Sequence, residues 1–227
     1  MAVAVHLKNV QFSYPRSAPL LEISELNIPQ GERIFIQGAS GSGKTTFLGL
    51  LTGILTPQSG SVEVLGQELT QLSSGRRDRF RGLEIGYIFQ MFNLLPHLTV
   101  EENIALPCQI FPQKRKRLDG SVREEIERLA SVLELTEHLK KSPLRLSVGQ
   151  QQRVAVARAL MGKPGLIVAD EPTSSLDSDR RNEFLRLLFE QVSASNATLI
   201  FVSHDSLLAD RFTRRLSMSN LAHGGRS

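Results

Sequence analysis

Alternating apolar residues run through the first third of the chain. Val3, Val5 and Leu7 occupy every second position, and the same spacing recurs over residues 21–28, with one slip, and over residues 61–65. A period of two is the pattern of a β-strand that buries one face. The first third is therefore predicted to form an antiparallel sheet.

The middle of the chain, from about residue 94 to residue 146, has the spacing of helices instead. Thr99–Glu102 and Ser121–Glu124 both fit the capping box that opens a helix. After the second box, apolar residues return on one helical face, at positions 122, 126, 129 and 133. This part is predicted to be helical, with the basic run 114–117 in a loop between two helices.

The last third alternates between the two patterns. Residues 166–169 and 198–202 form short, mostly apolar runs, and helices are predicted over residues 150–161 and 179–192. Strands without a polar face, separated by helices, are typical of a parallel sheet that is covered on both sides.

Length and composition narrow the class of protein. The 227 residues are 41% hydrophobic and 22% charged, which is ordinary for a globular protein, and the length fits one domain with a helical insert. No apolar run approaches the roughly 20 residues of a membrane-spanning helix, and the first residues lack the pattern of a signal peptide. Cys108 is the only cysteine. It cannot form an internal disulfide, which fits a reducing cytoplasm.

The net charge is +4, from 27 Lys and Arg against 23 Asp and Glu, and basic residues cluster at 76–81 and 114–117. Such clusters can bind nucleic acid or an anionic lipid surface. Neither is interleaved with several aromatic residues, as a single-strand nucleic-acid site would be, and charge runs are more often solvated faces. No nucleic-acid partner is expected.

The segment from Gly38 to Thr46 matches the phosphate-binding pattern G-x-x-x-x-G-K-[ST]. In that pattern the glycines let backbone N–H groups face the phosphates, the lysine reaches the β- and γ-phosphates, and the next hydroxyl suits Mg²⁺. The β-type segment 32–37 precedes it and a helix can begin at Thr46, an order that a chance glycine-rich turn would lack. These residues predict a nucleoside triphosphate site: Gly38, Ala39, Ser40, Gly41, Ser42, Gly43, Lys44, Thr45 and Thr46.

Charged and titratable residues follow two of the predicted strands. Asp170 and Glu171 come at the end of the first, and His204 follows the second. Because ligands of a parallel sheet bind beyond the carboxyl ends of its strands, these side chains are expected near the phosphate loop. Asp170 would hold Mg²⁺, Glu171 would orient or deprotonate the attacking water, and a ring N–H of His204 would contact a γ-phosphate oxygen. The alternatives are a turn or helix start for the acidic pair and a capping or surface role for the histidine.

A second anion-binding helix end is predicted within residues 146–153. Ser147 offers a hydroxyl and Gly149 an unhindered N–H group where a helix begins. One active site needs only one helix N-terminus to bind the phosphates, and the helix after the phosphate loop already supplies it. The pattern therefore indicates a site shared between two chains.

Together these motifs resemble those of the nucleotide-binding subunit of an ABC transporter, in the same order and over nearly the whole chain. Tyr14 resembles the aromatic residue that stacks on adenine, and Gln90 the glutamine that senses Mg²⁺ and the membrane partner. Residues 146–151 resemble the signature Leu-Ser-Gly-Gly-Gln, and residues 174–177 the loop that communicates across the dimer. The metal ligand, catalytic carboxylate and switch histidine of the family match Asp170, Glu171 and His204.

The resemblance implies an α/β fold of the P-loop NTPase class, an ABC-type ATPase domain with an antiparallel β subdomain and a helical subdomain. Residues 1–227 would form one domain, with the helical subdomain, at about 91–162, inserted in the α/β core. The chain would bind ATP and Mg²⁺, with Thr45, Gln90 and Asp170 at the metal. The implied catalytic residues are Lys44, Gln90, Glu171 and His204.

The resemblance also implies a head-to-tail dimer, expected to consist of two copies of this chain. Residues of one subunit would complete the nucleotide site of the other: Ser147, Gly149, Gln150 and Asp177. Closure on ATP and reopening after hydrolysis would drive an integral membrane permease subunit, with the docking surface in the helical middle of the chain. The ATPase would lie at the cytoplasmic face of the inner (plasma) membrane as a peripheral subunit.

The type of transporter is suggested by residues 89–107, which are similar to ATPases of the macrolide-export and lipoprotein-release type. Those subunits transmit mechanical force across a bacterial envelope. Amino-acid importer ATPases share part of the pattern and are an alternative. An ABC ATPase acting on nucleic acid or ribosomes is a further alternative, disfavoured because such proteins typically carry two domains, coiled coils or zinc inserts.

Val148 occupies a signature position that is usually glycine. Valine disfavours a left-handed backbone and adds bulk beside the partner's nucleotide. An extended or helical backbone there would cost little, whereas a left-handed one would slow hydrolysis. The chain is expected to hydrolyse ATP with a modest handicap.

Overall fold

The computed structural model describes residues 2–15, 19–174 and 176–222. The chain divides into two compact units, one made of Met1–Arg81 with Thr198–Ser227 and the other of Gly82–Ala197. The first unit carries the antiparallel strands and the phosphate loop, and the second carries most of the helices.

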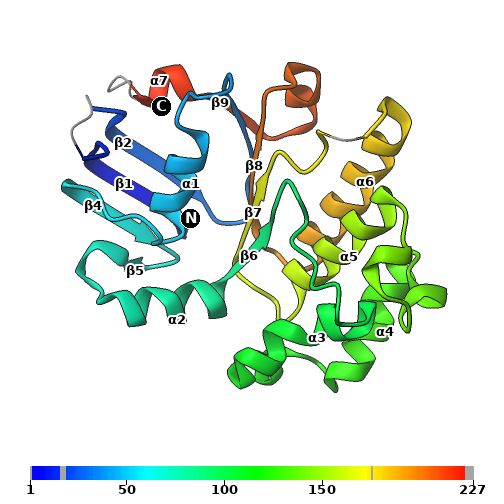
Figure 1. Cartoon of the computed structure of the whole chain (residues 1–227). Coiled ribbons are helices and arrows are strands. Elements are labelled where there is room, and N and C mark those ends of the chain that lie inside the picture. The colour runs from blue at the N-terminus through cyan, green and yellow to red at the C-terminus, as the bar shows by residue number, and fades with distance from the viewer. Residues whose placement is uncertain (1, 16–18, 175, 223–227) are drawn as a thin grey trace. The chain divides into compact units, whose positions relative to one another are not determined.

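An antiparallel sheet begins the first unit, as the alternating pattern predicts. Its strands are β1 (Val3–Phe12), β2 (Leu21–Pro29), β4 (Ser59–Val64) and β5 (Gln67–Glu68), in the order β2-β1-β4-β5 (Figure 1). The slip in the alternating pattern corresponds to a break in the burial of both strands. Where Lys8 of β1 lies opposite Glu25 of β2 in the register, each strand exposes two consecutive residues. Gly60 is required beside this step. Its φ is +84°, and an added Cβ would lie 2.3 Å from the carbonyl oxygen of Asn9.

Three parallel strands complete the first unit: β3 (Arg33–Gln37), β8 (Thr198–Ser203) and β9 (Arg214–Ser217), with β3 between the other two. Both β3 and β8 are buried almost throughout, and Phe35 stacks on Phe201 with ring centroids 6.2 Å apart. Helix α1 (Lys44–Leu51) follows β3, and the short helix α7 (Met218–Ala222) follows β9. The 3₁₀ turns η1 (Leu69–Gln71) and η5 (Ser206–Arg211) also belong to this unit.

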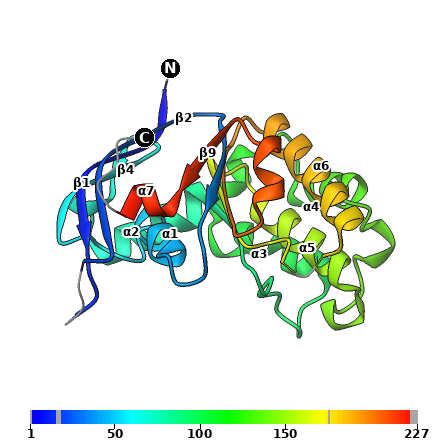
Figure 2. The same cartoon turned by 90° about the horizontal axis from the view of Figure 1, so that it is seen from above.

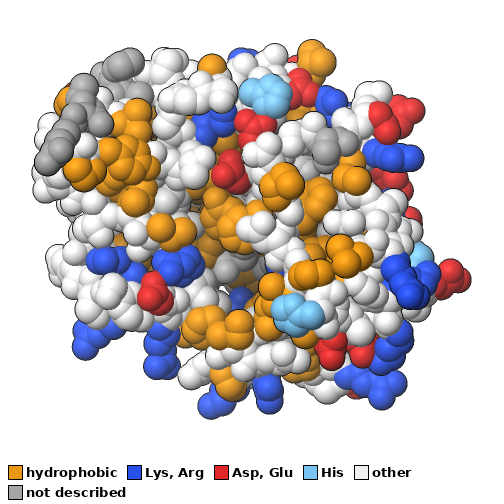
Figure 3. All heavy atoms as spheres, in the orientation of Figure 1, with side chains coloured by type: hydrophobic (Ala, Val, Ile, Leu, Met, Phe, Trp, Pro, Cys, Tyr) orange, Lys and Arg blue, Asp and Glu red, His pale blue; other side chains and the backbone are white. Residues whose placement is uncertain are grey.

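Helix α2 (Ser74–Glu84) was not predicted from the sequence. It buries none of its eleven residues, all of them described, so it has no apolar stripe to reveal it. Arg77 and Arg81 instead donate hydrogen bonds to the carbonyl oxygens of Leu72 and Thr52, at 2.8 and 3.1 Å. In the view of Figure 3, Lys and Arg side chains gather over the region of α2, which contains the basic run 76–81.

The second unit contains two paired parallel strands and, among its described residues, four further helices. The strands are β6 (Ile85–Ile88) and β7 (Leu166–Asp170), and the helices are α3 (Val100–Ile110), α4 (Val122–Val132), α5 (Val148–Leu160) and α6 (Ser178–Ala194) (Figures 1 and 2). Both predicted capping boxes are present, at Thr99 and Ser121. The 3₁₀ turns of this unit are η2 (Pro112–Arg117), η3 (Thr136–His138) and η4 (Pro143–Arg145).

Residues 114–117 lie between two helices as expected, in η2 between α3 and α4, and Arg115 and Lys116 are exposed. The expectation of a solvated run is wrong for Lys114, which is only 2% exposed. Its Nζ donates a hydrogen bond to the carbonyl oxygen of Met161 at 3.2 Å, and burial lowers the pKa of Lys114 to about 8. Arg117 forms an ion pair with Glu84. The lysine stem is covered by Gly162, where an added Cβ would lie 2.6 Å from the Cβ of Lys114.

Within the described residues, no helix is both long and apolar enough to cross a membrane. The assignment of residues 1–227 to one domain with an insert at about 91–162 stays a prediction.

Candidate active site

The phosphate loop joins β3 to the first turn of α1. Gly41 and Gly43 have φ values of +78° and +91°, which only glycine adopts without strain. Among the described loop residues 39–43, Ser42 alone donates its N–H group, to the carbonyl oxygen of Ala39 at 3.2 Å. The remaining N–H groups are available to an anion at the N-terminus of α1, as a phosphate-binding loop requires.

Lys44 lies against the loop that precedes it. Its Nζ donates hydrogen bonds to the carbonyl oxygens of Gly38 and Ala39, at 2.8 and 2.9 Å, and the side chain is buried. The hydroxyl oxygen of Ser42 is buried without a hydrogen-bond partner. A buried hydroxyl of this kind fits a site that a ligand oxygen completes. Thr45, the next residue, is exposed at the start of α1.

A hollow of about 630 Å³ lies beside the loop, lined by Leu20, Gln37, loop residues and Met218. Met218, the first residue of α7, is fully buried and lies close to Gly38 and Gly43 of the phosphate loop. An added Cβ on Gly38 would lie 2.8 Å from Cγ of Met218. The end of the described chain therefore supports the start of the phosphate loop.

Tyr14, the predicted adenine-stacking residue, is 45% exposed. Its ring packs edge-on against Phe12, with centroids 5.1 Å apart, and its hydroxyl lies 3.1 Å from the hydroxyl of Thr46 on α1. These contacts fix an exposed aromatic ring beside the helix that begins at the phosphate loop.

His204 lies next to the phosphate loop along the sheet. In the parallel register of β3 and β8, Gln37 is opposite Ser203. Gly38 and His204 are the next residues of the two strands, so they leave the sheet at the same edge. The His204 side chain is exposed. The first unit therefore brings together Tyr14, the phosphate loop and His204.

Asp170 ends strand β7 in the second unit and lies beside Tyr87 of β6. Tyr87 pairs with Val168, so Asp170 is the diagonal neighbour two residues further on the same face. Burial of Tyr87, and then the charge and hydrogen bond of Asp170, raise the pKa of the phenol. The phenol therefore stays protonated and donates to the Asp170 carboxylate, a partner that the sequence did not indicate.

Glu171 is held in an unusual conformation. Its φ is +48°, in the left-handed region, and the residue is only 9% exposed. The next residue, Pro172, accepts a hydrogen bond at its carbonyl oxygen from Nε2 of the buried Gln152, at 2.5 Å. Left-handed non-glycine residues persist only where surrounding contacts impose them, and they concentrate at functional sites.

Gln90 lies just beyond the end of β6. Since Ile88 pairs with Ala169, the register carries Gln90 to the level of Glu171 at the carboxyl ends of the two strands. Gln90 and Met91 are exposed, Met91 by 80%, while Phe89 stacks on Tyr87 with ring centroids 4.2 Å apart. The second unit thus brings together Gln90, Asp170 and Glu171.

The signature segment opens α5. Ser147 is the N-cap, its hydroxyl accepts from the N–H of Gln150 at 3.3 Å, and the Gln150 side chain accepts from the N–H of Ser147 at 2.9 Å. Val148 is the first helical residue and is 46% exposed. Gly149 is the second, so its N–H belongs to the open first turn. The backbone of Val148 is helical, the case in which the sequence predicts little cost.

Asp177 is the N-cap of α6. Its carboxylate accepts from the N–H of Arg180 at 3.0 Å and lies 3.4 Å from the Arg180 side chain. Ser175, within the predicted dimer-communication loop, is outside the described residues.

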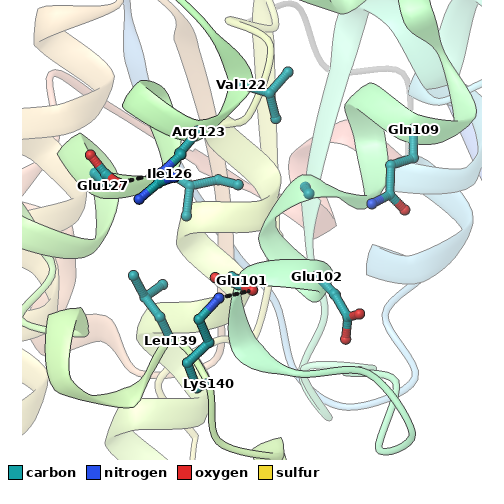
Figure 4. Close-up of a pocket in the computed structure, with 10 residues that line it drawn as sticks. Glu101, Glu102, Gln109, Val122, Arg123, Ile126, Glu127, Leu139 and Lys140 are labelled. Carbon is teal, nitrogen blue, oxygen red and sulfur yellow. Dashed lines mark hydrogen bonds and ion pairs between the residues drawn. The ribbon is translucent and has the colours of Figure 1, made fainter.

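A second hollow, of about 570 Å³, lies between α3 and α4 of the helical unit (Figure 4). Its lining includes the apolar side chains of Val122, Ile126 and Leu139. At its rim, Glu101 pairs with Lys140 at 2.5 Å, and Glu127 pairs with Arg123 at 2.9 Å. None of the predicted nucleotide or metal residues lines this groove.

Several residues that contact the candidate site segments were not identified from the sequence. Tyr87, Gln152, Arg158 and Met218 all touch site segments, but their roles depend on tertiary contacts that local patterns do not encode. One signal was available for Arg158, since it interrupts the apolar run of α5 from Val154 to Leu160.

A phosphate loop on a parallel strand, with carboxylates after another strand, defines a P-loop nucleoside triphosphatase. A family model described as "ABC transporter" matches residues 21–174. The lipoprotein-releasing system ATP-binding protein LolD of Pseudomonas fluorescens is 38% identical over 208 residues, 90% of this chain and 88% of that protein. LolD 1 of Chlorobium chlorochromatii is 36% identical, over 93% of this chain and 85% of that protein.

Among solved structures, the dimeric post-hydrolysis ATP-binding cassette MJ0796 bound to ADP and Pi has a TM-score of 0.80 and 33% identity. The match covers 94% of this chain and 93% of that one. The chain belongs to the ABC transporter family and has the ABC-type ATPase fold. It is an ATPase, and its resemblance to the lipoprotein-release type is confirmed.

Proposed function

We propose that the chain binds Mg²⁺-ATP on its phosphate loop and hydrolyses it in a head-to-tail dimer that drives a separate membrane permease. The observation that carries the proposal is the loop itself. Its N–H groups other than that of Ser42 are available, the Ser42 hydroxyl is buried without a partner, and Lys44 lies against the loop. This donor set matches the oxygens of a triphosphate and has no other evident use.

ATP would lie with its phosphates along residues 38–46 and its adenine on the ring of Tyr14. The hydrogen bond between Tyr14 and Thr46 supports this assignment, because it ties the exposed ring to the helix of the phosphate loop. Lys44 would exchange its two carbonyl partners for the β- and γ-phosphate oxygens.

Mg²⁺ would be held by the Thr45 hydroxyl, with Asp170 and Gln90 as further oxygen ligands, directly or through water. These are the hard oxygen donors that Mg²⁺ prefers. When bound, the metal neutralises charge on the phosphates. The hydrogen bond from Tyr87 orients the Asp170 carboxylate, whose oxygens would face the metal or its waters.

Hydrolysis would use Glu171 as the group that orients the attacking water and accepts its proton. The water oxygen forms a bond to the γ-phosphorus as the bond to the ADP oxygen breaks. The left-handed backbone of Glu171 and the hydrogen bond from Gln152 to Pro172 support a fixed aim for this carboxylate. His204 would donate a ring N–H to a γ-phosphate oxygen.

The second subunit, expected to be another copy of the chain, would close over the nucleotide with the first turn of its α5. Ser147, Gly149 and Gln150 offer a helix N-terminus for the γ-phosphate, and Asp177 lies at the start of α6. Ser147 and Gln150 already form a capping box, which keeps this turn ordered before it meets the partner.

The permease would be of the lipoprotein-release or macrolide-export type, with the ATPase peripheral at the cytoplasmic face of the inner membrane. The names of the relatives support this reading over an amino-acid importer. Residues 1–227 would act as one ATPase domain, whose helical part, at about 91–162, carries the docking surface. Copurification with a four-span membrane protein bearing a large extracytoplasmic domain is expected. Copurification with a many-span importer permease would overturn it.

The function is tested by the rate of ATP hydrolysis as a function of protein concentration, for wild type and Glu171→Gln. We expect a wild-type rate that rises faster than linearly, since two chains form each site. The variant should lose about 100-fold or more in rate, as expected for removal of a general base, while still binding ATP. Glu63→Gln on β4 is the matched control. A linear rate, or an active Glu171→Gln protein, would contradict the proposal.

A further inference from the structure

The loop that carries Gln90 contains two consecutive residues with left-handed backbone. Phe92 and Asn93 have φ values of +58° and +49°. The N–H of Phe92 donates to the carbonyl oxygen of Phe89 at 3.0 Å, and that of Asn93 to Met91 at 2.6 Å. Left-handed backbone is disfavoured for a bulky residue such as phenylalanine, so this turn needs support from outside the loop.

Arg158 of α5 supplies that support. Its two terminal nitrogens donate to consecutive carbonyl oxygens, Nη2 to Phe92 at 2.6 Å and Nη1 to Asn93 at 2.7 Å. The planar guanidinium offers its donors as a rigid fork, which suits two carbonyls that a left-handed turn brings side by side. Burial lowers the pKa of Arg158, yet arginine stays charged in proteins, so both bonds are charge-assisted.

The next part of the loop is held separately. Asn103 of α3 is fully buried, accepts from the N–H of Leu95 at 2.8 Å, and donates to the carbonyl oxygens of Leu95 and Thr99 at 3.0 and 2.9 Å. Loss of Arg158 should therefore loosen residues 89–94 and leave residues 95–99 in place.

Ser147 caps the other end of α5, and Gln152, in the N-terminal half of the helix, donates a hydrogen bond to the residue after Glu171. One helix thus makes fixed contacts with the loop of Gln90 and the loop of Glu171, and opens with the signature turn.

We propose that Arg158 is a positioning residue for ATP hydrolysis, which fixes the loop of Gln90 to the helix that carries the signature turn. A movement of this loop is then transmitted to Ser147 through a single helix rather than absorbed at a flexible joint. The proposal rests on the role assigned to Gln90 in the proposed function.

Arg158→Gln and Arg158→Lys test the proposal, with Arg123→Gln, an exposed arginine of α4, as the control. A glutamine side chain can donate to only one of the two carbonyl oxygens. A lysine keeps the positive charge but lacks the two parallel donors of the guanidinium. The first readout is amide hydrogen exchange of the nucleotide-free chain. We expect faster exchange at residues 89–94 in Arg158→Gln, unchanged exchange at residues 95–99, and an intermediate result for Arg158→Lys.

The second readout is kinetic. A misplaced catalytic loop should lower kcat by about 10- to 100-fold and change KM for ATP by less than about threefold. The loss should disappear when Arg158→Gln is made in a Gln90→Ala background, because both changes then remove the same contribution. Arg123→Gln should match wild type in both readouts.

Additive losses in the double variant, or faster exchange spread over the whole helical unit, would show that Arg158 only stabilises the fold and would overturn the proposal. Wild-type kcat in Arg158→Gln would overturn it as well. An active Gln90→Ala protein, with normal ATP hydrolysis by the wild type, would remove the role of Gln90 and with it this inference, while leaving the proposed ATPase function intact.

Discussion

Val148 is the residue at which this chain departs from its family pattern, and its backbone conformation decides what the departure costs. It is the first residue of α5, with a helical backbone and a half-exposed side chain. No left-handed conformation calls for glycine there. Val148→Gly is therefore expected to leave kcat for ATP within about twofold of wild type and to lower stability by about 0.5 kcal/mol.

Steady-state ATP hydrolysis and thermal unfolding of the same preparations measure both effects. A Val148→Gly protein that is several-fold faster would show that the side chain hinders the site in the closed dimer, as the sequence alone suggested.

Lys114 makes the stability of the chain depend on pH. Its pKa in the folded protein is about 8, against its usual value of 10.5. Between these values the unfolded chain binds more protons than the folded one, so stability rises with pH. The contribution of a neutral Lys114 is complete above the unfolded pKa and is lost as the pH falls through the folded one.

We therefore expect the free energy of unfolding of wild type, relative to Lys114→Met, to rise by up to about 3 kcal/mol between roughly pH 7 and pH 10.5. Methionine keeps the packed stem against Gly162 and removes the titration. Urea unfolding at a series of pH values gives the difference, and a Cys108→Ala background excludes the nearby thiol, whose own pKa is raised by burial. A difference that is flat with pH would contradict the assignment.

At the scale of elements, the sequence predicted what hydrophobic pattern and capping encode. The strands β1, β2, β3, β7 and β8, both capping boxes, and the long helices α5 and α6 are all confirmed. Helix α2 was missed because it buries no residue, and η2 because its basic run hides a lysine that is buried by tertiary contacts. The candidate site residues could also be read from the sequence, and their roles stay predictions. The contacts that Tyr87, Gln152 and Arg158 make with site segments could not be read from it.

The short helix α7 is an element whose role follows from packing alone. Met218 is fully buried against Gly38 of the phosphate loop. Met218→Ala should therefore lower stability by about 2 to 5 kcal/mol, as for other truncated core residues, and weaken ATP binding. Met218→Leu, which fills a similar volume, is the control and should retain both properties. Equilibrium binding of a fluorescent ATP analogue and thermal unfolding supply the data. Unchanged ATP affinity in a less stable Met218→Ala protein would confine α7 to a structural role.

At the scale of the whole molecule, each chain carries two candidate phosphate-binding features. The phosphate loop lies in one unit and the helix N-terminus at Ser147 in the other. We assign them to two different nucleotides, one bound by each subunit of the proposed head-to-tail dimer. The dimeric state of the MJ0796 cassette, at 33% identity, supports that assignment.

In the proposed dimer, Lys44 of one chain and Ser147 of another act on the same ATP, and mixing two inactive variants tests this arrangement. Lys44→Ala removes the lysine of the phosphate loop, and Ser147→Arg blocks the signature turn with a bulky side chain. Each variant should therefore be inactive alone. In the mixture, some dimers contain one site with an intact loop from the Ser147→Arg chain and an intact signature turn from the Lys44→Ala chain. We expect ATP hydrolysis to reappear on mixing and to grow with protein concentration. A mixture as inactive as its components, although mixed dimers are detected, would contradict it.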